Sequence, residues 1–264
     1  MADNLNLVID ERRGAAVWLT MNRPDVRNAL ARELVAELRA GVERAIADED
    51  ARAIVLAGAG PVFCAGADVN QYRIASHRDE VLADGERLFD LLDTIATSPK
   101  PVIARVQKAA YGGAIGLVAA ADLVVASDDT RFSLSEARLG LVPAVIGKSV
   151  VRALGPRQAR AAMLLAEPFN ADEARRIGLV HRVVSTEALD EAVETWVSQI
   201  RSNAPGALRD SKVLVHDIAF GGFSDEEIRA RSTSLAADRR AGAEGQEGMN
   251  AFLEKRHAAW NSEG

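Results

Sequence analysis

The sequence of 264 residues has little cysteine, few aromatic side chains and no surplus of basic charge. The single cysteine, Cys64, excludes an internal disulfide and any metal site built from several thiolates. The chain carries 32 Lys and Arg against 38 Asp and Glu, a net charge of −6 that argues against a nucleic-acid partner or an acidic membrane surface. A phosphate-bearing ligand would therefore need a local cluster of basic residues.

Several other signals are missing. No apolar run approaches the roughly 18 residues of a membrane span, and the first residues lack the basic-then-apolar order of a secretory signal. We therefore expect a cytoplasmic protein without a membrane partner. The four histidines show no metal-ligand spacing, so no metal site is predicted. No Gly-x-Gly-x-x-Gly follows the early strands and no Gly-x-Ser-x-Gly occurs, which argues against a dinucleotide cofactor and against a serine hydrolase.

The residues that are present predict an α/β protein with a large core, because 48% of them are hydrophobic. Strands are predicted over residues 5–10, 15–20, 53–57, 101–106, 122–126, 131–133 and 180–184. Helices are predicted over 31–47, 81–97, 144–154, 157–166 and 171–177, with a short helix over 135–139 capped by Ser135. Strand, strand and helix recur in this order through the first two thirds of the chain.

Only helices are predicted after residue 186, over 187–202, 205–219, 225–240 and 246–260. The composition shifts near residues 203–206. We therefore predict a core with the active site over residues 1–202 and a helical C-terminal region over 203–264.

The turn Tyr111-Gly112-Gly113 is the most informative stretch of the sequence. A strand leads into it, and small apolar residues continue beyond it as a buried helix. Glycines let the main chain approach a ligand without interference from Cβ, and a helix start offers free N–H groups with partial positive charge. Such donors can hold the negative oxygen of an enolate. A tight turn packed under the core would have the same sequence, so both interpretations stay open here.

The loop Phe63-Cys-Ala-Gly-Ala-Asp68 has the same design, since it also follows an apolar strand and opens a helix. If the two preceding strands are neighbours, one N–H group from each loop can point to the same place. Two main-chain donors arranged in this way form an oxyanion hole, and the loss of one donor typically costs about 3 kcal/mol of transition-state stabilisation.

Together, several motifs resemble the enoyl-CoA hydratase/isomerase (crotonase) superfamily. They are the two glycine loops, the segment Phe132–Pro143, Asn22-Arg-Pro near the start and Gly248–Arg256 near the end. Each motif is weak alone, but all occur in the expected order over essentially the whole chain. The resemblance implies the crotonase (ClpP/crotonase-like) spiral of ββα units with a helical C-terminal region. It also implies a coenzyme A (CoA) thioester as substrate, no separate cofactor, and a homotrimer or homohexamer assembled through the terminal helices.

The resemblance also assigns roles to residues by position. The backbone N–H groups of Ala67 and Gly113 would form the oxyanion hole around the thioester oxygen. Asn70 stands where some members carry a lysine, which weakens the electrostatic part of the CoA site. Seven residues would contact CoA: three at its adenine and pantetheine, two near its phosphates and two from a neighbouring subunit. In that order they are Ala65, Asp68 and Val69, then Val26 and Arg27, then Phe252 and Lys255.

Glu136 matches the glutamate with which this superfamily transfers protons at the α and β carbons of the substrate. Its sequence neighbours are apolar, among them Leu134, Leu139 and Leu141. If they surround the carboxyl group in space, desolvation raises its pKa toward the range useful for proton exchange near neutrality. Without the resemblance, a glutamate in the first turn of a short helix would be interpreted as a surface residue favoured by the helix dipole.

Gly116 is the main departure from the family pattern. Hydratases with two glutamates carry the second one three residues beyond the oxyanion glycine, and a glycine cannot activate water. Three interpretations remain open. Glu136 both activates water and delivers the proton, or Glu136 only moves one proton between carbons as an isomerase does, or another side chain has taken over the role of the second glutamate.

The segment around Glu136, with Pro143-Ala-Val-Ile146, resembles the branch that hydrates methylglutaconyl-CoA and related branched thioesters. We therefore favour an enoyl-CoA hydratase of acyl-CoA and fatty acid metabolism. The distal carboxylate of such a substrate would meet Arg73, Arg138 or Lys148, although each of these is first of all a candidate for a solvated surface charge. The alternatives are a Δ3-Δ2 enoyl-CoA isomerase that uses Glu136 alone and a non-catalytic acyl-CoA-binding homologue.

Overall fold

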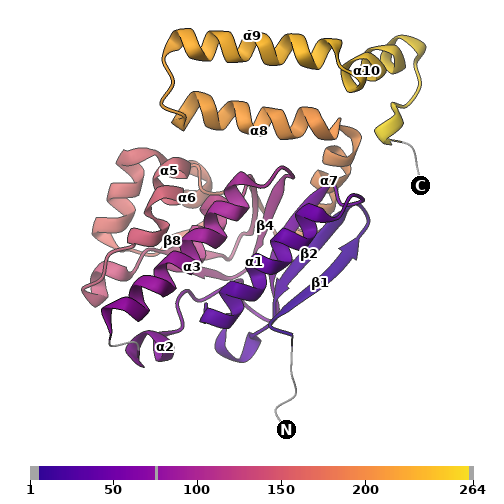
Figure 1. Cartoon of the computed structure of the whole chain (residues 1–264). Helices are drawn as coiled ribbons and strands as arrows, with labels where there is room; N and C mark the ends of the chain where they lie inside the picture. Colours follow the sequence, from indigo (N-terminus) through magenta and orange to yellow (C-terminus); the bar gives the residue numbers. More distant parts are fainter. Residues whose placement is uncertain (1–5, 75–76, 262–264) are drawn as a thin grey trace.

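A computed structural model describes residues 6–74 and 77–261, without the side chains of residues 72–74. A central sheet is covered by helices on both faces, and a layer of C-terminal helices lies beyond one side of this core (Figure 1). The α/β class predicted from the sequence is therefore confirmed.

The main sheet has six strands in the order β1-β2-β3-β4-β6-β9. The first two form the predicted antiparallel hairpin, and each later strand pairs in parallel with its neighbour. Every residue of β3 is buried, as expected of a parallel strand with both faces covered. The bounds are β1 (Val8–Arg13), β2 (Ala16–Met21), β3 (Ala53–Gly58), β4 (Val102–Val106), β6 (Leu123–Ser127) and β9 (Arg182–Val184).

A second, three-stranded sheet lies beside the first and has the order β5-β7-β8. Its strands are β5 (Ala109–Tyr111), β7 (Arg131–Ser133) and β8 (Phe169–Asn170). Only β7 was predicted. The strands β5 and β8 show no periodic pattern of their own, so pairing with neighbours rather than local sequence defines them.

The helices of the core divide between the two faces of the main sheet. Apolar side chains of α1, α3 and α4 join one buried cluster with strand residues such as Leu19 and Leu56, while α7 covers the opposite face around Trp18 and Val55. The bounds are α1 (Arg32–Ala47), α2 (Val69–Ile74), α3 (Arg78–Thr97), α4 (Gly113–Ala120), α5 (Ala144–Leu165), α6 (Ala171–Arg176) and α7 (Leu189–Ser202). Short 3-10 turns are η1 (Pro24–Val26), η2 (Glu136–Leu139), η3 (Thr186–Ala188) and η4 (Ala259–Asn261).

Two details of the predicted helices were wrong. Ser135 precedes η2, but its side chain makes no capping hydrogen bond. The last helix, α10 (Ala243–Glu254), ends at Glu254 because Lys255 adopts a left-handed conformation with φ 55°. The predicted break at Gly155 is confirmed, because φ is 71° there and α5 consists of two helical segments that meet at a kink at this glycine. Asp122 behaves as expected at the start of a strand, since its carboxylate accepts a hydrogen bond from the Val102 N–H at 2.8 Å.

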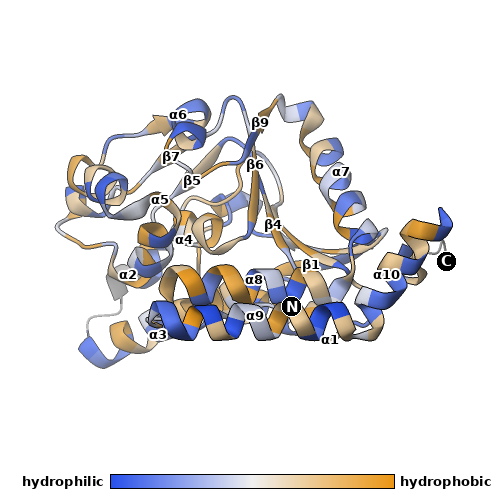
Figure 2. Cartoon of the chain, turned by 90° about the horizontal axis from the view of Figure 1, so that it is seen from above, coloured by the Kyte–Doolittle hydropathy of each residue, from blue (hydrophilic) through white to orange (hydrophobic). Residues whose placement is uncertain are grey.

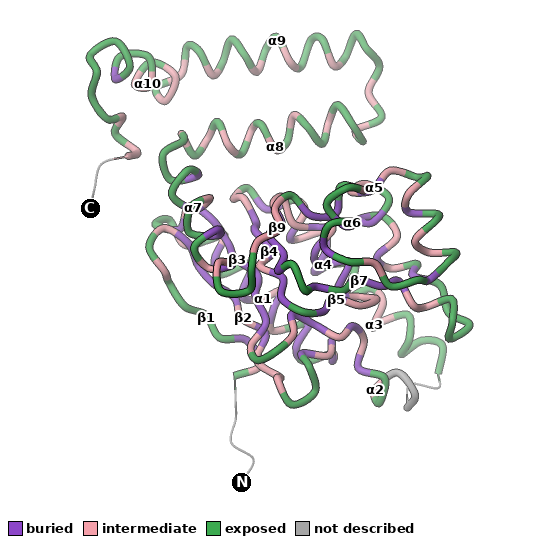
Figure 3. Tube along the Cα trace, turned by 180° about the vertical axis from the view of Figure 1, so that it is seen from behind, coloured by how far each residue is buried: buried purple, intermediate pink, exposed green. Residues whose placement is uncertain are grey.

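The C-terminal layer consists of α8 (Pro205–Phe220), α9 (Asp225–Ala241) and α10. The helix α10 covers Ala243–Glu254, and among the described residues after 203 only Ala251 is buried (Figure 3). Apolar and polar residues are mixed along α8 and α10 (Figure 2), and several apolar side chains there face solvent. Lys212 attaches α8 to the core, because its Nζ donates to Asp122 Oδ2 at 2.7 Å. The boundary at residues 202 and 203 stays a prediction. None of the described helices is long and apolar enough to cross a bilayer.

Candidate active site

The two glycine loops singled out in the sequence lie against each other. The strands β3 and β4 are parallel neighbours, and an isolated parallel bridge joins Cys64 to Ala110 farther along the two segments. The Tyr111 N–H donates to the Cys64 carbonyl at 3.3 Å, and the Cys64 N–H donates to the Ala109 carbonyl at 3.1 Å. The predicted proximity of the two loops is therefore confirmed.

Glycine is required at two points of this contact. Gly66 has φ 94°, and a Cβ at this position would lie 2.6 Å from the Tyr111 carbonyl oxygen. Gly112 has φ 50°, and a Cβ there would lie 3.2 Å from Glu136 Oε1. Positive φ angles strain other residues, and the close approach of backbone to backbone leaves no space for a side chain. The glycines thus bring both loops and the Glu136 carboxylate to one place.

The N–H groups of Ala67 and Gly113 are available to a ligand. Both peptide groups flanking Ala67 are paired with Leu30, since Leu30 N–H donates to Gly66 O and Asp68 N–H donates to Leu30 O. Gly113 is the first residue of α4, where N–H groups have no partner within the helix. In the part of the chain that the structure describes, neither N–H donates a hydrogen bond.

Among the side chains that the structure describes, Glu136 is the one with a buried polar atom left unsatisfied. Its Oε2 atom is buried and has no hydrogen-bond partner among the described residues. Burial raises the pKa of Glu136 above the ordinary glutamate value. This confirms the predicted effect of the apolar surroundings, because Leu139, Leu141 and Val142 line the same cavity as the carboxylate.

A cavity of about 390 Å³ contains all of these groups. Both glycine loops and Glu136 form part of its wall, and most of the remaining wall is apolar and comes from α1, α3 and the start of α5. Of the described residues, two carboxylates line this cavity, Asp84 and Glu136. Asp84 is already engaged, because Arg32 and Arg87 both bind it at 2.7 to 2.8 Å. An apolar cavity with few polar groups is typical of a small-molecule site.

Gly116 packs too tightly for any side chain. A Cβ at this position would lie 2.5 Å from Cγ2 of Ile146, which is 2% exposed, and 3.2 Å from Leu92 Cδ1. The volume that a second glutamate would need is thus filled by apolar atoms of α5 and α3. A carboxylate at position 116 would require these helices to repack.

The residues predicted to contact CoA fall into three groups. Ala65 and Val69 line the cavity, and the Ala65 N–H donates to the Arg27 carbonyl at 2.9 Å, which brings the 26–27 turn to the same edge. Val26 is 44% exposed. Asp68 differs, because its side chain does not line the cavity and instead forms an ion pair with Arg23 at 3.0 Å.

Phe252 and Lys255 lie in the C-terminal layer, away from the cavity of the same chain. Phe252 is 83% exposed. These two residues therefore do not reach the cavity of their own subunit. Their contact with CoA in a neighbouring subunit stays a prediction.

Of the residues predicted to meet a distal carboxylate, Arg138 and Lys148 are not on the cavity wall. Arg138 is exposed, and Lys148 forms an ion pair with Asp93 at 2.6 Å. The side chain of Arg73 lies outside the described residues. Among the side chains that the structure describes, the guanidinium groups lining the cavity are those of Arg32 and Arg87. Sequence reasoning missed both, because each looks like an ordinary charge on an amphipathic helix.

Asn28 and Arg23 were also missed. Asn28 is fully buried, and its side-chain amide donates to the carbonyls of Ala59, Val62 and Phe63 at 2.9 to 3.1 Å. Arg23 is the arginine of Asn22-Arg-Pro and Asn28 ends the turn that follows it, so the motif was noticed but its contacts could not be deduced. No three His, Cys, Asp or Glu side chains within the described ranges are grouped so as to hold a metal ion.

Two loops present main-chain donors to one cavity, and a desolvated carboxylate lies beside one of these loops. This arrangement is typical of an enzyme that acts on acyl thioesters. The family model "Enoyl-CoA hydratase/isomerase" matches residues 11–263. A crotonyl-CoA hydratase from Syntrophomonas wolfei is 34% identical over 259 residues, which cover 96% of either chain.

Solved structures agree with this match. A chain from Legionella pneumophila, provisionally described as an enoyl-CoA hydratase/isomerase (crotonase), has 41% identity and a TM-score of 0.91, covering 97% of this chain and 100% of that one. An enoyl-CoA hydratase from Shewanella pealeana has 34% identity and a TM-score of 0.92, covering 97% of each chain. The protein belongs to the enoyl-CoA hydratase/isomerase family, the crotonase superfamily, and is an enzyme with the crotonase fold.

Proposed function

We propose that the protein is an enoyl-CoA hydratase that adds water across the C2–C3 double bond of an acyl-CoA thioester. The thioester oxygen accepts hydrogen bonds from Ala67 N–H and Gly113 N–H, which stabilise the enolate that forms during the reaction. Glu136 takes a proton from a water molecule while the oxygen of that water bonds to C3. Glu136 then delivers a proton to C2. The hydroxyl group and the hydrogen added to the double bond thus both come from water, and the reaction needs no cofactor.

The observation that carries this proposal is the buried, unpartnered Oε2 of Glu136 beside the glycine turn. A carboxylate without a hydrogen-bond donor is a stronger base, and burial has already raised its pKa. The other carboxylate of the cavity wall, Asp84, is already engaged in ion pairs with Arg32 and Arg87. Glu136 is therefore the group on this wall that is suited to general acid–base catalysis.

The alternative is a Δ3-Δ2 enoyl-CoA isomerase, in which Glu136 moves one proton between carbons. The filled space at Gly116 favours this alternative over a two-glutamate hydratase, since an isomerase needs only one base. The hydratase names of relatives such as the one from S. wolfei favour hydration with Glu136 acting twice. A third alternative, acyl-CoA binding without turnover, gives no reason for the desolvated carboxylate.

We further propose that the acyl group carries a distal carboxylate, as in branched glutaconyl thioesters. Arg32 and Arg87 both line the cavity and both pair with Asp84, and Arg32 also lies 3.8 Å from the Glu80 carboxylate. Guanidinium groups bind a second carboxylate readily through their remaining N–H donors. The apolar wall formed by residues such as Leu88 and Val142 suits the branch of the acyl chain.

CoA is proposed to bind along Val26, Arg27, Ala65 and the 68–69 segment, with its phosphates toward Arg27. Phe252 and Lys255 of a neighbouring subunit complete the site in a homotrimer or homohexamer. The exposed apolar side chains of α8 and α10 support such an assembly, because large exposed apolar patches mark interfaces. A cytoplasmic location in acyl-CoA metabolism belongs to this proposal.

A panel of enoyl-CoA thioesters tests the proposal. Hydration lowers the absorbance of a conjugated 2-enoyl thioester, whereas isomerisation raises it on a 3-enoyl thioester. We expect a fall with straight 2-enoyl substrates, and a higher kcat/KM with a 3-methylglutaconyl substrate. Arg87→Gln should lower kcat/KM for the carboxylated substrate only. A rise on 3-enoyl substrates without any fall on 2-enoyl ones would establish the isomerase instead.

A further inference from the structure

The direction of the Ala67 N–H group is set by a short parallel bridge to Leu30. Leu30 N–H donates to Gly66 O at 2.7 Å, and Asp68 N–H donates to Leu30 O at 3.1 Å. Both flanking peptide groups are used in this way, so the N–H between them points to the opposite side, toward the cavity. Any rotation of the bridge would turn this donor away from a bound carbonyl oxygen.

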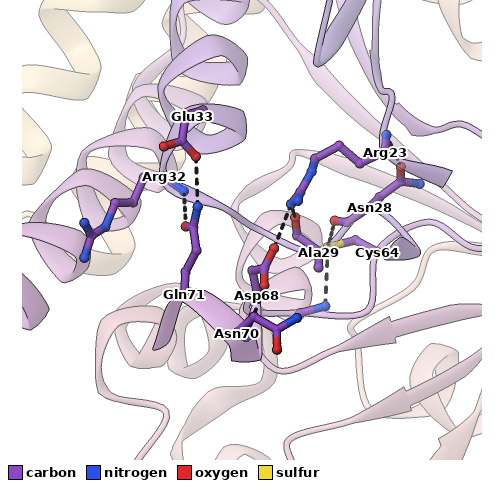
Figure 4. Close-up of polar contacts among 10 residues, drawn as sticks. Arg23, Asn28, Ala29, Arg32, Glu33, Cys64, Asp68, Asn70 and Gln71 are labelled. Atoms are coloured by element: carbon purple, nitrogen blue, oxygen red, sulfur yellow. Dashed lines mark hydrogen bonds and ion pairs between the residues drawn. The ribbon is translucent and has the colours of Figure 1, made fainter. Parts of the chain in front are cut away.

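The guanidinium group of Arg23 fastens both sides of this bridge at once. Its Nη1 donates to the Ala29 carbonyl at 2.6 Å and to Asp68 Oδ2 at 3.0 Å (Figure 4). Ala29 precedes Leu30, and Asp68 follows Ala67, so one nitrogen links the residues next to each bridge partner. The contact is well shielded, because the side chains of Arg23 and Asp68 are 22% and 11% exposed. Charge-assisted hydrogen bonds of this kind are stronger than neutral ones.

The preceding turn is held rigid by Asn28. Its side chain accepts from the Arg23 N–H at 2.9 Å and donates to three carbonyls of the 59–63 loop. The Cys64 thiol donates to the Asn28 carbonyl at 3.0 Å. The backbone that carries Arg23 is therefore held in place by these hydrogen bonds, and its side chain is not a loosely attached surface residue. The Asp68 carboxylate is fixed as well, because its Oδ1 accepts from the Asn70 N–H at 3.2 Å.

We propose that Arg23 is a positioning residue of the oxyanion hole, which acts through Asp68 and Ala29 to aim the Ala67 N–H at the thioester oxygen. The inference rests on the proposed function, since it assumes that this N–H binds the substrate carbonyl. Neither Arg23 nor the Asp68 side chain lines the cavity, so both act without touching the substrate. Asp68 thereby acquires a role different from the CoA contact that its motif implies.

The test compares carbonyl polarisation and kinetics in Arg23→Met. The probe is butyryl-CoA labelled with ¹³C at the thioester carbon, which is saturated and does not react. Binding to the wild-type enzyme should shift the carbonyl stretching band to lower frequency, because two donors polarise the bond. We expect Arg23→Met to lose more than half of this shift. We expect its kcat to fall about 10- to 100-fold, with KM changed about twofold or less.

Two further variants separate positioning from general stability. Arg44→Met is the matched control, since Arg44 also joins two elements through two hydrogen bonds to one carboxylate, that of Asp10. Arg44→Met should lower the melting temperature and keep the full wild-type shift of the carbonyl band. If Arg23→Met does not fold, Arg23→Lys replaces it, because lysine keeps the charge but cannot reproduce the fixed planar geometry of a guanidinium group. It should lose part of the band shift.

A full wild-type shift retained in Arg23→Met or Arg23→Lys would overturn the inference while leaving the oxyanion hole intact. Absence of the shift in the wild-type enzyme itself would overturn the proposed function and, with it, the inference. The two failures are thus distinguished by the wild-type spectrum alone.

Discussion

At the scale of single residues, Glu136 combines two properties that oppose each other. Its buried oxygen lacks a hydrogen-bond donor, so the charged form is poorly stabilised, yet the cavity around it stays open to a ligand of acyl size. Groups of this kind lower the stability of the folded protein and are retained where a reaction uses them. The sequence motif predicted the residue, and the apolar neighbours predicted the direction of its pKa shift.

The raised pKa of Glu136 gives a prediction about stability and pH. The folded protein holds this proton more tightly than the unfolded chain, so the stability due to the group is fully present below the ordinary glutamate pKa, about 4.3, and is lost as pH rises through the folded pKa. Glu136→Gln should therefore melt at a higher temperature than wild type at pH 7, and the difference should disappear near pH 4. Glu191→Gln, on the exposed face of α7, controls for the loss of one charge. A lower melting temperature of Glu136→Gln at pH 7 would contradict this.

Gly116 gives a second prediction at this scale. Alanine normally stabilises a helix interior relative to glycine by up to about 1 kcal/mol, but a Cβ here would lie 2.5 Å from Ile146 Cγ2. Overpacking of this kind costs about 1–3 kcal/mol, so Gly116→Ala should lower the free energy of unfolding in a denaturant titration.

Gly147→Ala in α5 is the matched control, because a Cβ there would meet nothing within 4 Å. It should be neutral or stabilising. The double variant Gly116→Ala/Ile146→Ala should be more stable than the sum of its single changes predicts, since the second substitution removes the clashing methyl group. Stabilisation by Gly116→Ala alone would show that the helices α3 and α5 yield easily, and that a second carboxylate could be accommodated.

At the scale of elements, the candidate active site depends on the approach of two loops and not on either loop alone. Gly66 and the Tyr111 carbonyl come so close that the main chains nearly touch. Each loop was recognised in the sequence from its glycines and its position between a strand and a helix. Their contact could be expected only from the order of the strands, because nothing local in either loop encodes the other.

Gly66→Ala should therefore impair both stability and catalysis. The substitution adds strain at φ 94° and places Cβ 2.6 Å from a backbone oxygen that cannot move cheaply. We expect kcat to fall about 10²-fold or more, since a misplaced donor has effects of this size.

Gly14→Ala in the β1–β2 turn separates strain from contact. Gly14 also has a positive φ of 55°, but a Cβ there would have no neighbour within 4 Å. This variant should lose about 1 kcal/mol of stability and keep its kcat. Equal kcat values in Gly66→Ala and wild type, measured by enoyl absorbance, would mean that the loop contact does not shape the oxyanion hole.

Helices and strands were predicted correctly where the hydrophobic pattern extends over many residues. They were missed where pairing with a neighbouring strand determines the structure. The amphipathic helices α1 and α3 and the apolar strand β3 were predicted within a few residues, because each has enough side chains to show its period. The strand β8 has two residues and exists only through its partner β7. Contacts such as those of Asn28 join residues 31 to 35 positions apart and have no local signature.

At the scale of the whole molecule, the C-terminal layer carries apolar side chains that the single chain leaves exposed. Its helices were predicted, and α9 begins with a capping box at Ser224 and Glu227. Yet Met249, Phe252 and Leu253 on α10 are 40%, 83% and 76% exposed in the single chain. An amphipathic pattern shows that a helix has an apolar face, but it does not identify what covers that face.

Phe252→Asp/Leu253→Asp tests the proposed assembly. Charges at an apolar interface are costly to bury, so the variant should sediment as a smaller species than the homotrimer or homohexamer proposed for the wild type, and it should show a higher KM. Lys255→Ala is the control for charge at the same helix end, and it should raise KM without changing the mass. A wild-type protein that sediments as a monomer would contradict the assembly, and an unchanged KM in both variants would contradict the contact to CoA.

The most direct measurement is turnover of crotonyl-CoA by the wild-type protein and by Glu136→Gln in ¹⁸O-labelled water. The wild-type protein should remove the conjugated absorbance and yield a 3-hydroxyacyl thioester that carries ¹⁸O at C3. Glu136→Gln should bind butyryl-CoA with nearly unchanged affinity by calorimetry and lose turnover by about 10²–10⁴-fold, the usual contribution of a general acid–base. Most of the activity surviving in Glu136→Gln would contradict the central role given to this carboxylate.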